Sequence, residues 1–411
     1  MPASARRAWW VALAGVLAGC AEGRGPSAPV VPEPEPTPTV EVRALWVSRF
    51  EYDSPAKIAE ILAKAARAHF NVVFFQVRGA GDAWYRSLLE PCAVGLCARL
   101  GGVPSWDPLE VAVREAHARG LQLHAWLNAL TAWPSGSAAA CSQLRESDPG
   151  QPRHLLLAHP EWRVVDDLGA PHACPNGEEY VYLSPAVPGV RIHLARVAAD
   201  MVRRYAVDGI HLDRIRLSGP RFTYDSAALT TFGRDPAADP VAWAEARRRF
   251  VELAVRAVAD SVRAVRPVPI SAAVWGIYED RWGWNASSGR RDYFQDPRAW
   301  ASAGILDAAV PMTYFRIQPS YCARTDWLCL LDDHVQGYRP TGRPAVIGIR
   351  ALPEWGMEEV TRQIRWARMR GAAGVSVYSF SSADALNAWD ALATGAFAQP
   401  ATLPPLGRLR R

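Results

Sequence analysis

An acidic residue stands at the end of an apolar segment near the middle of the sequence. Asp213 directly follows Ile210–Leu212, and the segment otherwise has the character of a buried strand. A buried carboxylate is costly unless it is paired or used in function. By the two-residue period of a strand, Asp213 shares a face with His211. We interpret Asp213 as a catalytic or ligand-binding carboxylate. The alternative is a structural ion pair with one of three arginines, Arg214, Arg216 or Arg78.

A carboxylate in this position suggests acid–base chemistry, which usually needs a second carboxyl group. Cleavage of a glycosidic bond ordinarily uses one group to protonate the leaving oxygen and another as nucleophile or base. The acids that follow other predicted strands are Glu51, Asp53, Asp82, Glu279 and Asp280. We rank Glu51 and Glu279 first as catalytic partners because they lie closest to their strand ends. One carboxylate suffices in a second route, in which the N-acetyl group of the sugar attacks the anomeric carbon.

Aromatic and polar side chains gather at the ends of the predicted strands. The candidates for substrate binding are Arg78, Asp82, Trp84, His124, Trp126, Asn128, His211, Trp275 and Tyr314. Aromatic rings stack on the C–H faces of sugars, and the polar groups can hydrogen-bond hydroxyls. Each aromatic residue alone could equally pack inside the fold, so the prediction of a glycan site depends on their accumulation.

Two other kinds of chemistry have little support in the sequence. The nine histidines are scattered, and no HExxH motif occurs, so we expect no metal and no other cofactor. A lone histidine such as His124 is typical of a hydrogen-bonded interior position. The GxSxG turn of a serine nucleophile is also missing.

Eight short segments rich in β-branched and aromatic residues must position these side chains. We predict strands over Val42–Phe50, Asn71–Arg78, Leu121–Asn128, Gly209–Arg216, Pro269–Trp275, Ala308–Tyr314, Ala345–Arg350 and Gly374–Phe380. Helical patterns separate them, among them Pro55–His69, Pro108–Arg119, Val190–Tyr205, Val241–Arg266 and Met357–Arg370. Ser54 and Asp107 are the predicted N-caps of the first two of these helices.

This alternation of strand and helix predicts the fold class. It requires parallel strands joined by right-handed crossovers, and eight repeats favour a single α/β (β/α)8 TIM barrel with insertions. An open doubly wound sheet usually carries a glycine-rich phosphate loop after its first strand, and none is present here. In a TIM barrel the functional site lies at the carboxyl ends of the strands.

The amino terminus has the features of a lipoprotein signal peptide. Arg6 and Arg7 precede an apolar run that ends in Leu17–Cys20 and is too short to span a membrane. We predict a signal peptide over residues 1–19, with Cys20 as the lipidated first residue of the mature chain. The alternative is an ordinary secretory peptide that is cleaved nearby. The predicted location is the bacterial cell envelope, where the N-terminal lipid anchors the protein to a membrane.

The rest of the chain divides into a tether, one large domain and a tail. Residues 20–40 are proline-rich and form the tether, 41–395 form the barrel, and 396–411 form the tail. The formal net charge of +5 includes Arg6 and Arg7, so removal of the signal peptide leaves +3. With 46 basic and 41 acidic residues and no long basic block, nucleic-acid binding has little support.

Six cysteines remain after Cys20, an even number in an exported chain. Their spacing along the sequence predicts three local disulfides, Cys92–Cys97, Cys141–Cys174 and Cys322–Cys329. A metal site would more often show CxxC pairs with neighbouring histidines.

Short motifs occur in a fixed order along the predicted barrel, between Val42 and about Trp389. They are Arg43–Val47, Phe75–Arg78 with Gly81–Tyr85, Leu123–Asn128, His159–Trp162, Tyr182–Ala186, Asp208–Asp213 and Val310–Tyr314. The set resembles the bacterial glycoside-hydrolase-like family 10 (DUF187). The resemblance implies a TIM barrel that hydrolyses an N-acetylated polysaccharide such as peptidoglycan glycan strands, with Asp213 as the matched acid. The family pattern usually has a second acid directly after it, where this chain has Arg214.

Three classes of function remain open at this point. The leading hypothesis is a metal-independent glycosidase of the envelope with a polysaccharide substrate. The second is a non-catalytic glycan-binding lipoprotein on the same barrel. A hydrolase of an amide or ester bond is disfavoured because it would usually bring a metal triad or a serine nucleophile.

Overall fold

The computed structural model describes residues 38–145 and 152–404. The predicted signal peptide, Cys20 and most of the tether lie outside these residues, as does the tail from residue 405. Within the described residues, no helix combines the length and the apolar character that crossing a bilayer would require.

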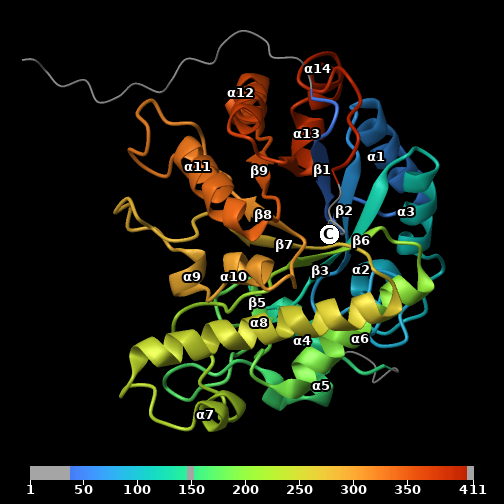
Figure 1. The fold of residues 1–411 in the computed structure, drawn as a ribbon. Helices are drawn as coiled ribbons and strands as arrows, with labels where there is room; N and C mark the ends of the chain where they lie inside the picture. The colour runs from blue at the N-terminus through green and yellow to red at the C-terminus, as the bar shows by residue number, and fades with distance from the viewer. Residues whose placement is uncertain (1–37, 146–151, 405–411) are drawn as a thin grey trace, which may run out of the picture.

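Eight parallel strands form one sheet that curves into a barrel, with helices around it (Figure 1). The strands are β1 (Val42–Val47), β2 (Val72–Arg78), β3 (Gln122–Asn128), β6 (Gly209–Asp213), β7 (Ile270–Trp275), β8 (Ala308–Met312), β9 (Val346–Arg350) and β10 (Gly374–Tyr378). They pair in the order β8-β7-β6-β3-β2-β1-β10-β9. A parallel bridge between Ala309 and Ala345 joins the two ends of this order. The prediction of a TIM barrel is confirmed, and each predicted strand contains one of these eight.

Helices connect the strands and cover the outside of the barrel. They are α1 (Pro55–Arg67), α2 (Val94–Cys97), α3 (Pro108–His117), α4 (Ala138–Arg145), α5 (Leu155–Ala158), α6 (Pro188–Arg204), α7 (Ser226–Phe232), α8 (Pro240–Val265), α9 (Gly289–Asp292), α10 (Pro297–Ser302), α11 (Trp327–Tyr338), α12 (Gly356–Met369), α13 (Phe380–Ala385) and α14 (Ala388–Thr394). Short 3-10 turns lie at Pro160–Trp162, Arg339–Thr341 and Pro353–Trp355.

The predicted N-caps begin their helices. The Ser54 hydroxyl accepts a hydrogen bond from the backbone N–H of Lys57, and the Asp107 carboxylate accepts from Leu109 and Glu110. A proline follows each cap, where its missing N–H costs nothing. These local signals determine the first residues of α1 and α3. They therefore also determine the last residues of the loops that precede these two helices.

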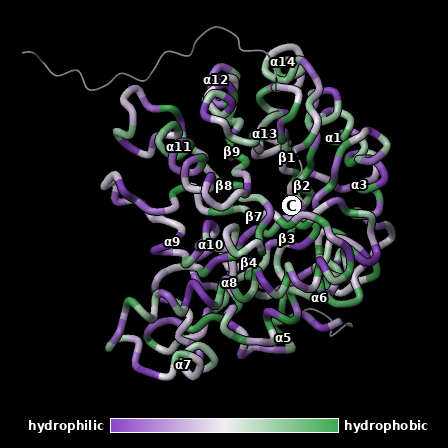
Figure 2. Tube along the Cα trace, in the orientation of Figure 1, coloured by the Kyte–Doolittle hydropathy of each residue, from purple (hydrophilic) through white to green (hydrophobic). Residues whose placement is uncertain are grey.

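The strands place alternate residues on the two sides of the barrel wall. Ala44, Trp46, Phe74 and Trp126 belong to the core inside the barrel, whereas Leu45 and its outward-facing equivalents pack against the helices. In Figure 2 several barrel strands are largely hydrophobic, and α12 on the outside is largely hydrophilic. The pattern fills the barrel below its carboxyl end and leaves only the last inward residues free to form a site.

An insertion between β3 and β6 builds one side of that end of the barrel. It contains a two-stranded antiparallel sheet of β4 (Thr131–Pro134) and β5 (Tyr180–Tyr182), which the sequence did not predict. The Cys141–Cys174 disulfide ties the segments of this insertion together. Cys92–Cys97 and Cys322–Cys329 are also bonded, so the prediction of three local disulfides is confirmed.

Candidate active site

A cavity of about 520 Å³ opens at the carboxyl end of the barrel. Seven strands each contribute an inward-facing side chain from their carboxyl ends to its lining. These side chains are Trp46 of β1, Gln76 of β2, Asn128 of β3, Asp213 of β6, Met312 of β8, Arg350 of β9 and Tyr378 of β10. Because alternate residues of a strand point to the same side, the position of a residue in its strand determines whether its side chain can line the cavity.

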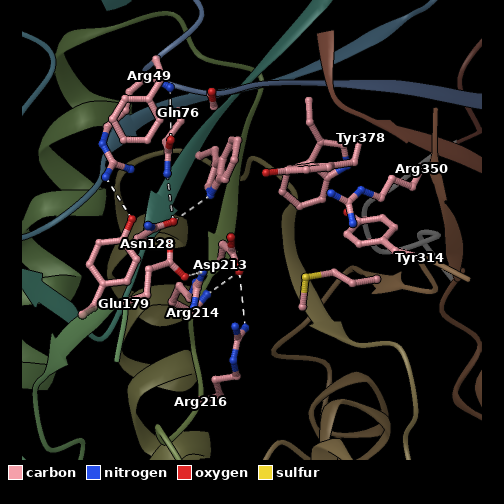
Figure 3. A pocket seen from close by; sticks show the side chains of 16 residues that line it. Arg49, Gln76, Asn128, Glu179, Asp213, Arg214, Arg216, Tyr314, Arg350 and Tyr378 are labelled. Carbon is pink, nitrogen blue, oxygen red and sulfur yellow. Dashed lines mark hydrogen bonds and ion pairs between the residues drawn. The ribbon is translucent and has the colours of Figure 1, made fainter. Parts of the chain in front are cut away.

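Asp213 ends β6 and is 8 % exposed. The next residue, Arg214, has a φ of 51°, which ends the strand, and its backbone N–H donates to Asp213 Oδ1 at 2.6 Å. The Arg216 Nη1 atom lies 3.6 Å from the same oxygen. Figure 3 shows Asp213 between the Arg214 side of the cavity and the side formed by Tyr314 and Arg350. The carboxylate is therefore held in place by its own chain and faces the space that a ligand would fill.

Glu179 is the second carboxylate that lines the cavity in the described part of the chain. It precedes β5 in the insertion, its side chain is 60 % exposed, and its Oε2 atom accepts a hydrogen bond from Arg214 Nη2. Arg214 also donates to the Tyr182 hydroxyl at 3.4 Å. Arg214 therefore links the two acids, through its backbone to Asp213 and through its side chain to Glu179.

The floor and one wall of the cavity form a connected network. The rings of Trp46 and Trp126 meet edge to face with centroids 4.8 Å apart. The Asn128 side-chain oxygen accepts hydrogen bonds from Trp126 Nε1 and from Gln76 Nε2, both at 3.1 Å. Gln76 in turn accepts from the backbone N–H of Arg49 at 3.1 Å. Because these groups satisfy one another, the wall keeps its shape without a ligand.

Two tyrosines form the opposite wall. The rings of Tyr314 and Tyr378 lie 5.2 Å apart, and the buried Tyr314 hydroxyl has no hydrogen-bond partner within the described residues. Burial, together with the nearby Tyr378 and Asp213, raises the pKa of Tyr314 well above its ordinary value of 10. The hydroxyl therefore stays protonated at neutral pH and can donate a hydrogen bond into the cavity.

The sequence pattern of the family described as "Glycosyl hydrolase-like 10" matches residues 41–349. The chain belongs to this family. The glycosyl hydrolase YngK of Bacillus subtilis (strain 168) is 25 % identical over 399 residues, which cover 89 % of this chain and 74 % of that protein. The glycosyl hydrolase DigH of Escherichia coli (strain K12) is 26 % identical over 408 residues, covering 87 % of this chain and 88 % of that protein.

A solved structure shares the fold of this glycosyl hydrolase-like 10 chain. The glycoside hydrolase domain of PgaB (BpsB) from Bordetella bronchiseptica superposes with a TM-score of 0.63 and 15 % sequence identity. The superposition covers 86 % of this chain and 98 % of that domain. At this level of identity the similarity concerns the barrel and not the choice of substrate.

Four of the site residues that we predicted from the sequence line the cavity. They are Asp213, Trp126, Asn128 and Tyr314. Sequence reasoning did not select Glu179 or Tyr180, which lie in the insertion far from any predicted strand end. Trp46, Arg49, Gln76, Arg214, Arg216, Arg350 and Tyr378 lie at strand ends and line the cavity, but were not among the selected residues. The two-residue period could have identified Gln76, Arg350 and Tyr378.

Three predicted binding residues at the end of β2 and in the loop after it lie outside the cavity lining. The pairing of β2 with β3 shifts between Gln76 and Arg78, so Arg78 leaves the inward face. It is ion-paired with the buried Glu90 at 2.8 Å and also donates to the carbonyls of Asn128 and Ala129. Asp82 accepts from the backbone N–H of Ala80, and Trp84 packs against Tyr52. These side chains shape the loops that follow β2 and β3.

His124 and His211 lie lower in the barrel, beneath the cavity. The His211 ring stacks on Phe74 with centroids 4.0 Å apart, and its Nδ1 atom is 2.8 Å from the Ser271 hydroxyl. Burial lowers the pKa of His124 to about 4, and burial together with His124 lowers the pKa of His211 well below its ordinary value. Both rings are therefore neutral at physiological pH.

The predicted catalytic partners of Asp213 also lie outside the cavity lining. The Glu51 carboxylate accepts hydrogen bonds from the Ser48 backbone, the Ser379 hydroxyl and the Ser381 backbone, so it joins the loops after β1 and β10. Glu279 is ion-paired with Arg290 at 3.1 Å. Trp275, predicted to bind substrate, instead lies beneath the Arg216 guanidinium, 5.4 Å from it.

Proposed function

We propose that this protein is a glycoside hydrolase that cleaves an N-acetylated polysaccharide such as peptidoglycan glycan strands, with Asp213 as a catalytic carboxylate. One observation carries the proposal. In the described part of the chain, the cavity at the carboxyl end of the barrel is lined by two carboxylates, Asp213 and Glu179. Membership of the glycosyl hydrolase-like 10 family supports the same reaction class.

The two acids correspond to the groups that this reaction needs. Hydrolysis breaks the bond between the anomeric carbon and the leaving oxygen, transfers a proton to that oxygen and adds water to the carbon. Asp213 and Glu179 can divide these roles, and Glu179 replaces Glu51 and Glu279 as our choice of partner. Arg214, which stands where the family pattern has an acid, brings Glu179 to this part of the cavity through their ion pair.

A second route fits a sugar that carries an N-acetyl group. The acetamido oxygen attacks the anomeric carbon, and the protein must orient this group and supply a proton donor. The free Tyr314 hydroxyl is available to hydrogen-bond the acetamido group beside Asp213. This route explains why a partnerless buried hydroxyl stands next to the acid.

Aromatic groups around the cavity support a sugar ligand. Trp46 and Trp126 form an apolar floor, and the Phe50 ring at the cavity edge is 75 % exposed. An exposed aromatic ring next to polar hydrogen-bonding groups is the usual composition of a carbohydrate platform. The ring of Phe50 also carries the Arg49 guanidinium at 4.3 Å, which fixes its position.

We also propose that the mature protein is anchored in the bacterial envelope through a lipid on Cys20. The apolar run before Cys20 and the proline-rich segment after it support this location. The three disulfides are compatible with it, because such bonds form in oxidising compartments outside the cytoplasm. The barrel would then act at the end of the proline-rich tether, close to the cell wall.

The alternative is a glycan-binding lipoprotein without catalytic activity. It is favoured by the arginines at the site, since each of the two carboxylates has a guanidinium beside it. Such ion pairs are equally suited to a site that only binds its ligand.

Release of reducing ends from peptide-free peptidoglycan strands separates these functions. The mature protein and its Asp213→Ala variant are incubated with the strands, and new reducing ends and bound protein are both measured. We expect release by the wild type and very little by the variant. Equal release by both would remove Asp213 from the mechanism. Binding without release by either protein would favour the glycan-binding alternative.

A further inference from the structure

Positive charge exceeds negative charge in the cavity lining. Four arginines, Arg49, Arg214, Arg216 and Arg350, face the two carboxylates of Asp213 and Glu179. We propose that the cavity selects a glycan that carries carboxylate groups, and that Arg216 and Arg350 provide this selectivity. The inference rests on the proposed function and specifies its substrate class.

Two of the four arginines make hydrogen bonds within the protein. The Arg49 guanidinium donates to the Tyr180 hydroxyl at 3.0 Å and lies over the Phe50 ring. Arg214 is paired with Glu179. Both side chains therefore hold the insertion and the cavity edge in place, and the hydrogen-bond donors that remain unused belong to the other two arginines.

Arg216 is a buried guanidinium without a hydrogen bond among the described residues. The residue is 5 % exposed, and its buried Nη1 atom has no hydrogen-bond partner. Its contacts are the Trp275 ring, the Tyr293 ring and the Asp213 carboxylate at 3.6 Å, which is longer than a hydrogen bond. Because a buried donor without a partner is costly, a ligand oxygen at this point would be strongly favoured.

Arg350 is the second arginine with unused hydrogen-bonding capacity. It ends β9 on the inner face, and its guanidinium makes no hydrogen bond or ion pair with the described residues. Figure 3 shows it beside Tyr314 and Tyr378, across the cavity from Glu179. Its charge is close enough to oppose the rise in the pKa of both tyrosines. A ligand in the cavity would therefore meet a free guanidinium on this side.

A carboxylate fits these two groups better than a neutral sugar does. The planar guanidinium offers paired N–H groups that match the two oxygens of a carboxylate. A neutral N-acetylated polymer would cover Arg350 and leave its charge unmatched, at a cost in desolvation. Arg216 already faces the Asp213 carboxylate but has an unused donor in Nη1. A glycan with acidic groups on some of its sugars would satisfy both arginines while another sugar lies at Asp213.

The test compares one polymer in two forms. Peptide-free glycan strands are used intact, or after carbodiimide activation and borohydride reduction have converted their carboxylates to primary alcohols. We expect the wild-type protein to cleave the intact strands at least about tenfold faster, measured as kcat/KM, with a preference that declines as salt is added. Equal or faster cleavage of the reduced strands would overturn the inference.

Variants assign the preference to Arg350. The Arg350→Gln variant should bring the ratio of kcat/KM for intact and reduced strands close to one. The control is Arg316→Gln, an exposed arginine after β8 that does not line the cavity, which should keep the wild-type ratio. An unchanged ratio in Arg350→Gln, or an equal loss in the control, would contradict the assignment.

Failure of the proposed function has a different signature. If the wild type cleaves neither polymer, hydrolysis is excluded, and the inference is decided by equilibrium binding of the same two polymers. Tighter binding of the intact strands would support carboxylate recognition by a binding protein. Equal binding of both polymers, or binding of neither, would overturn it.

Discussion

Two groups of polar side chains lie near the carboxyl end of the barrel and differ in how many of their hydrogen-bonding groups have a partner. In the first, Arg78 and Glu90 are both fully enclosed, and Arg78 donates to the Glu90 carboxylate and to two backbone carbonyls. In the second, Arg216, Arg350 and Tyr314 line the cavity with polar groups that have no hydrogen-bond partner in the described chain. The first group completes the fold, and the second has capacity for a ligand.

This difference shows how the same residue type serves two purposes in one barrel. Burial of an arginine is tolerated when its donors are used, as for Arg78, and such a residue contributes to stability. An arginine whose donors are unused, such as Arg216, is held in place by aromatic contacts and costs free energy until a ligand binds. Substitutions in the first group should therefore change stability, and those in the second should change activity.

The largest effect on activity outside Asp213 is expected for Glu179→Gln. If Glu179 is the partner of Asp213, kcat should fall by about 10²- to 10⁴-fold, the usual contribution of a general acid or base. Because its ion pair with Arg214 is solvent-exposed, Tm should change little. Steady-state kinetics and thermal unfolding measure the two effects. The matched control, Glu279→Gln, removes an acid outside the cavity lining, and a similar loss there would disprove the assignment.

The largest effect on stability is expected for Glu90→Gln, which leaves Arg78 buried without its counter-ion. Loss of one partner from a buried pair costs about 3–5 kcal/mol. Burial alone would raise the pKa of Glu90, but Arg78 and His193 outweigh it and lower that pKa to about 2. The pKa of Glu90 in the folded protein thus lies below 4.5, its ordinary value in the unfolded chain. The ionised carboxylate therefore contributes its full stabilisation at pH values above 4.5.

This stabilisation should be lost as the pH falls from 4.5 towards 2. The difference in Tm between the wild type and Glu90→Gln should accordingly be largest at neutral pH and shrink in acid. Calorimetry across this range measures it. A difference that stays constant with pH would show that Glu90 does not act through its charge.

A smaller loss of activity is expected for Tyr314→Phe. The variant removes the cavity hydroxyl and keeps the ring, so kcat/KM should fall by about tenfold, as for one hydrogen bond to a substrate, while Tm is maintained. Tyr338→Phe is the control, because its buried hydroxyl also lacks a partner but lies at the other end of the barrel. Equal kinetics of Tyr314→Phe and the wild type would exclude a direct contact between this hydroxyl and the substrate.

The smallest effect on activity is expected for Glu51→Gln. This carboxylate accepts three hydrogen bonds that join the loops after β1 and β10, so its replacement should lower stability by about 1–2 kcal/mol. The change in kcat should stay below about tenfold, far less than for a general acid or base. A drop in kcat as large as that of Glu179→Gln would instead support Glu51 as the catalytic partner.

The sequence predicted the fold well because its signals are local. Each strand is a short apolar segment, and Ser54 and Asp107 mark helix starts through contacts within one turn. Predicted strands were too long at their carboxyl ends, for example at Arg214, because its positive φ ends β6 without any change in residue character. The two-stranded sheet of β4 and β5 was missed because its short strands are separated by more than forty residues in the sequence. Local sequence patterns do not encode such a contact.

The site was predictable only where the two-residue period of a strand determines which way a side chain points. Inward-facing positions of β3 and β6 hold Trp126, Asn128 and Asp213, and all three line the cavity. Arg78 shares that parity in the sequence, but the register shift after Gln76 redirects it towards Glu90. Glu179 was not predictable, because the folding of the insertion and its ion pair with Arg214 bring it to the cavity.

Hydrolysis in heavy-oxygen water tests the central claim most directly. The mature protein is incubated with peptide-free glycan strands in H₂¹⁸O, and the new chain ends are examined by mass spectrometry. We predict one heavy oxygen at each new reducing end with the wild type, and no new ends with Asp213→Asn. The control Asp208→Asn, altered at the residue before β6 that accepts a hydrogen bond from the backbone N–H of Leu123, should retain the labelled product. New ends without the label, or full labelling by Asp213→Asn, would contradict a hydrolytic site built on Asp213.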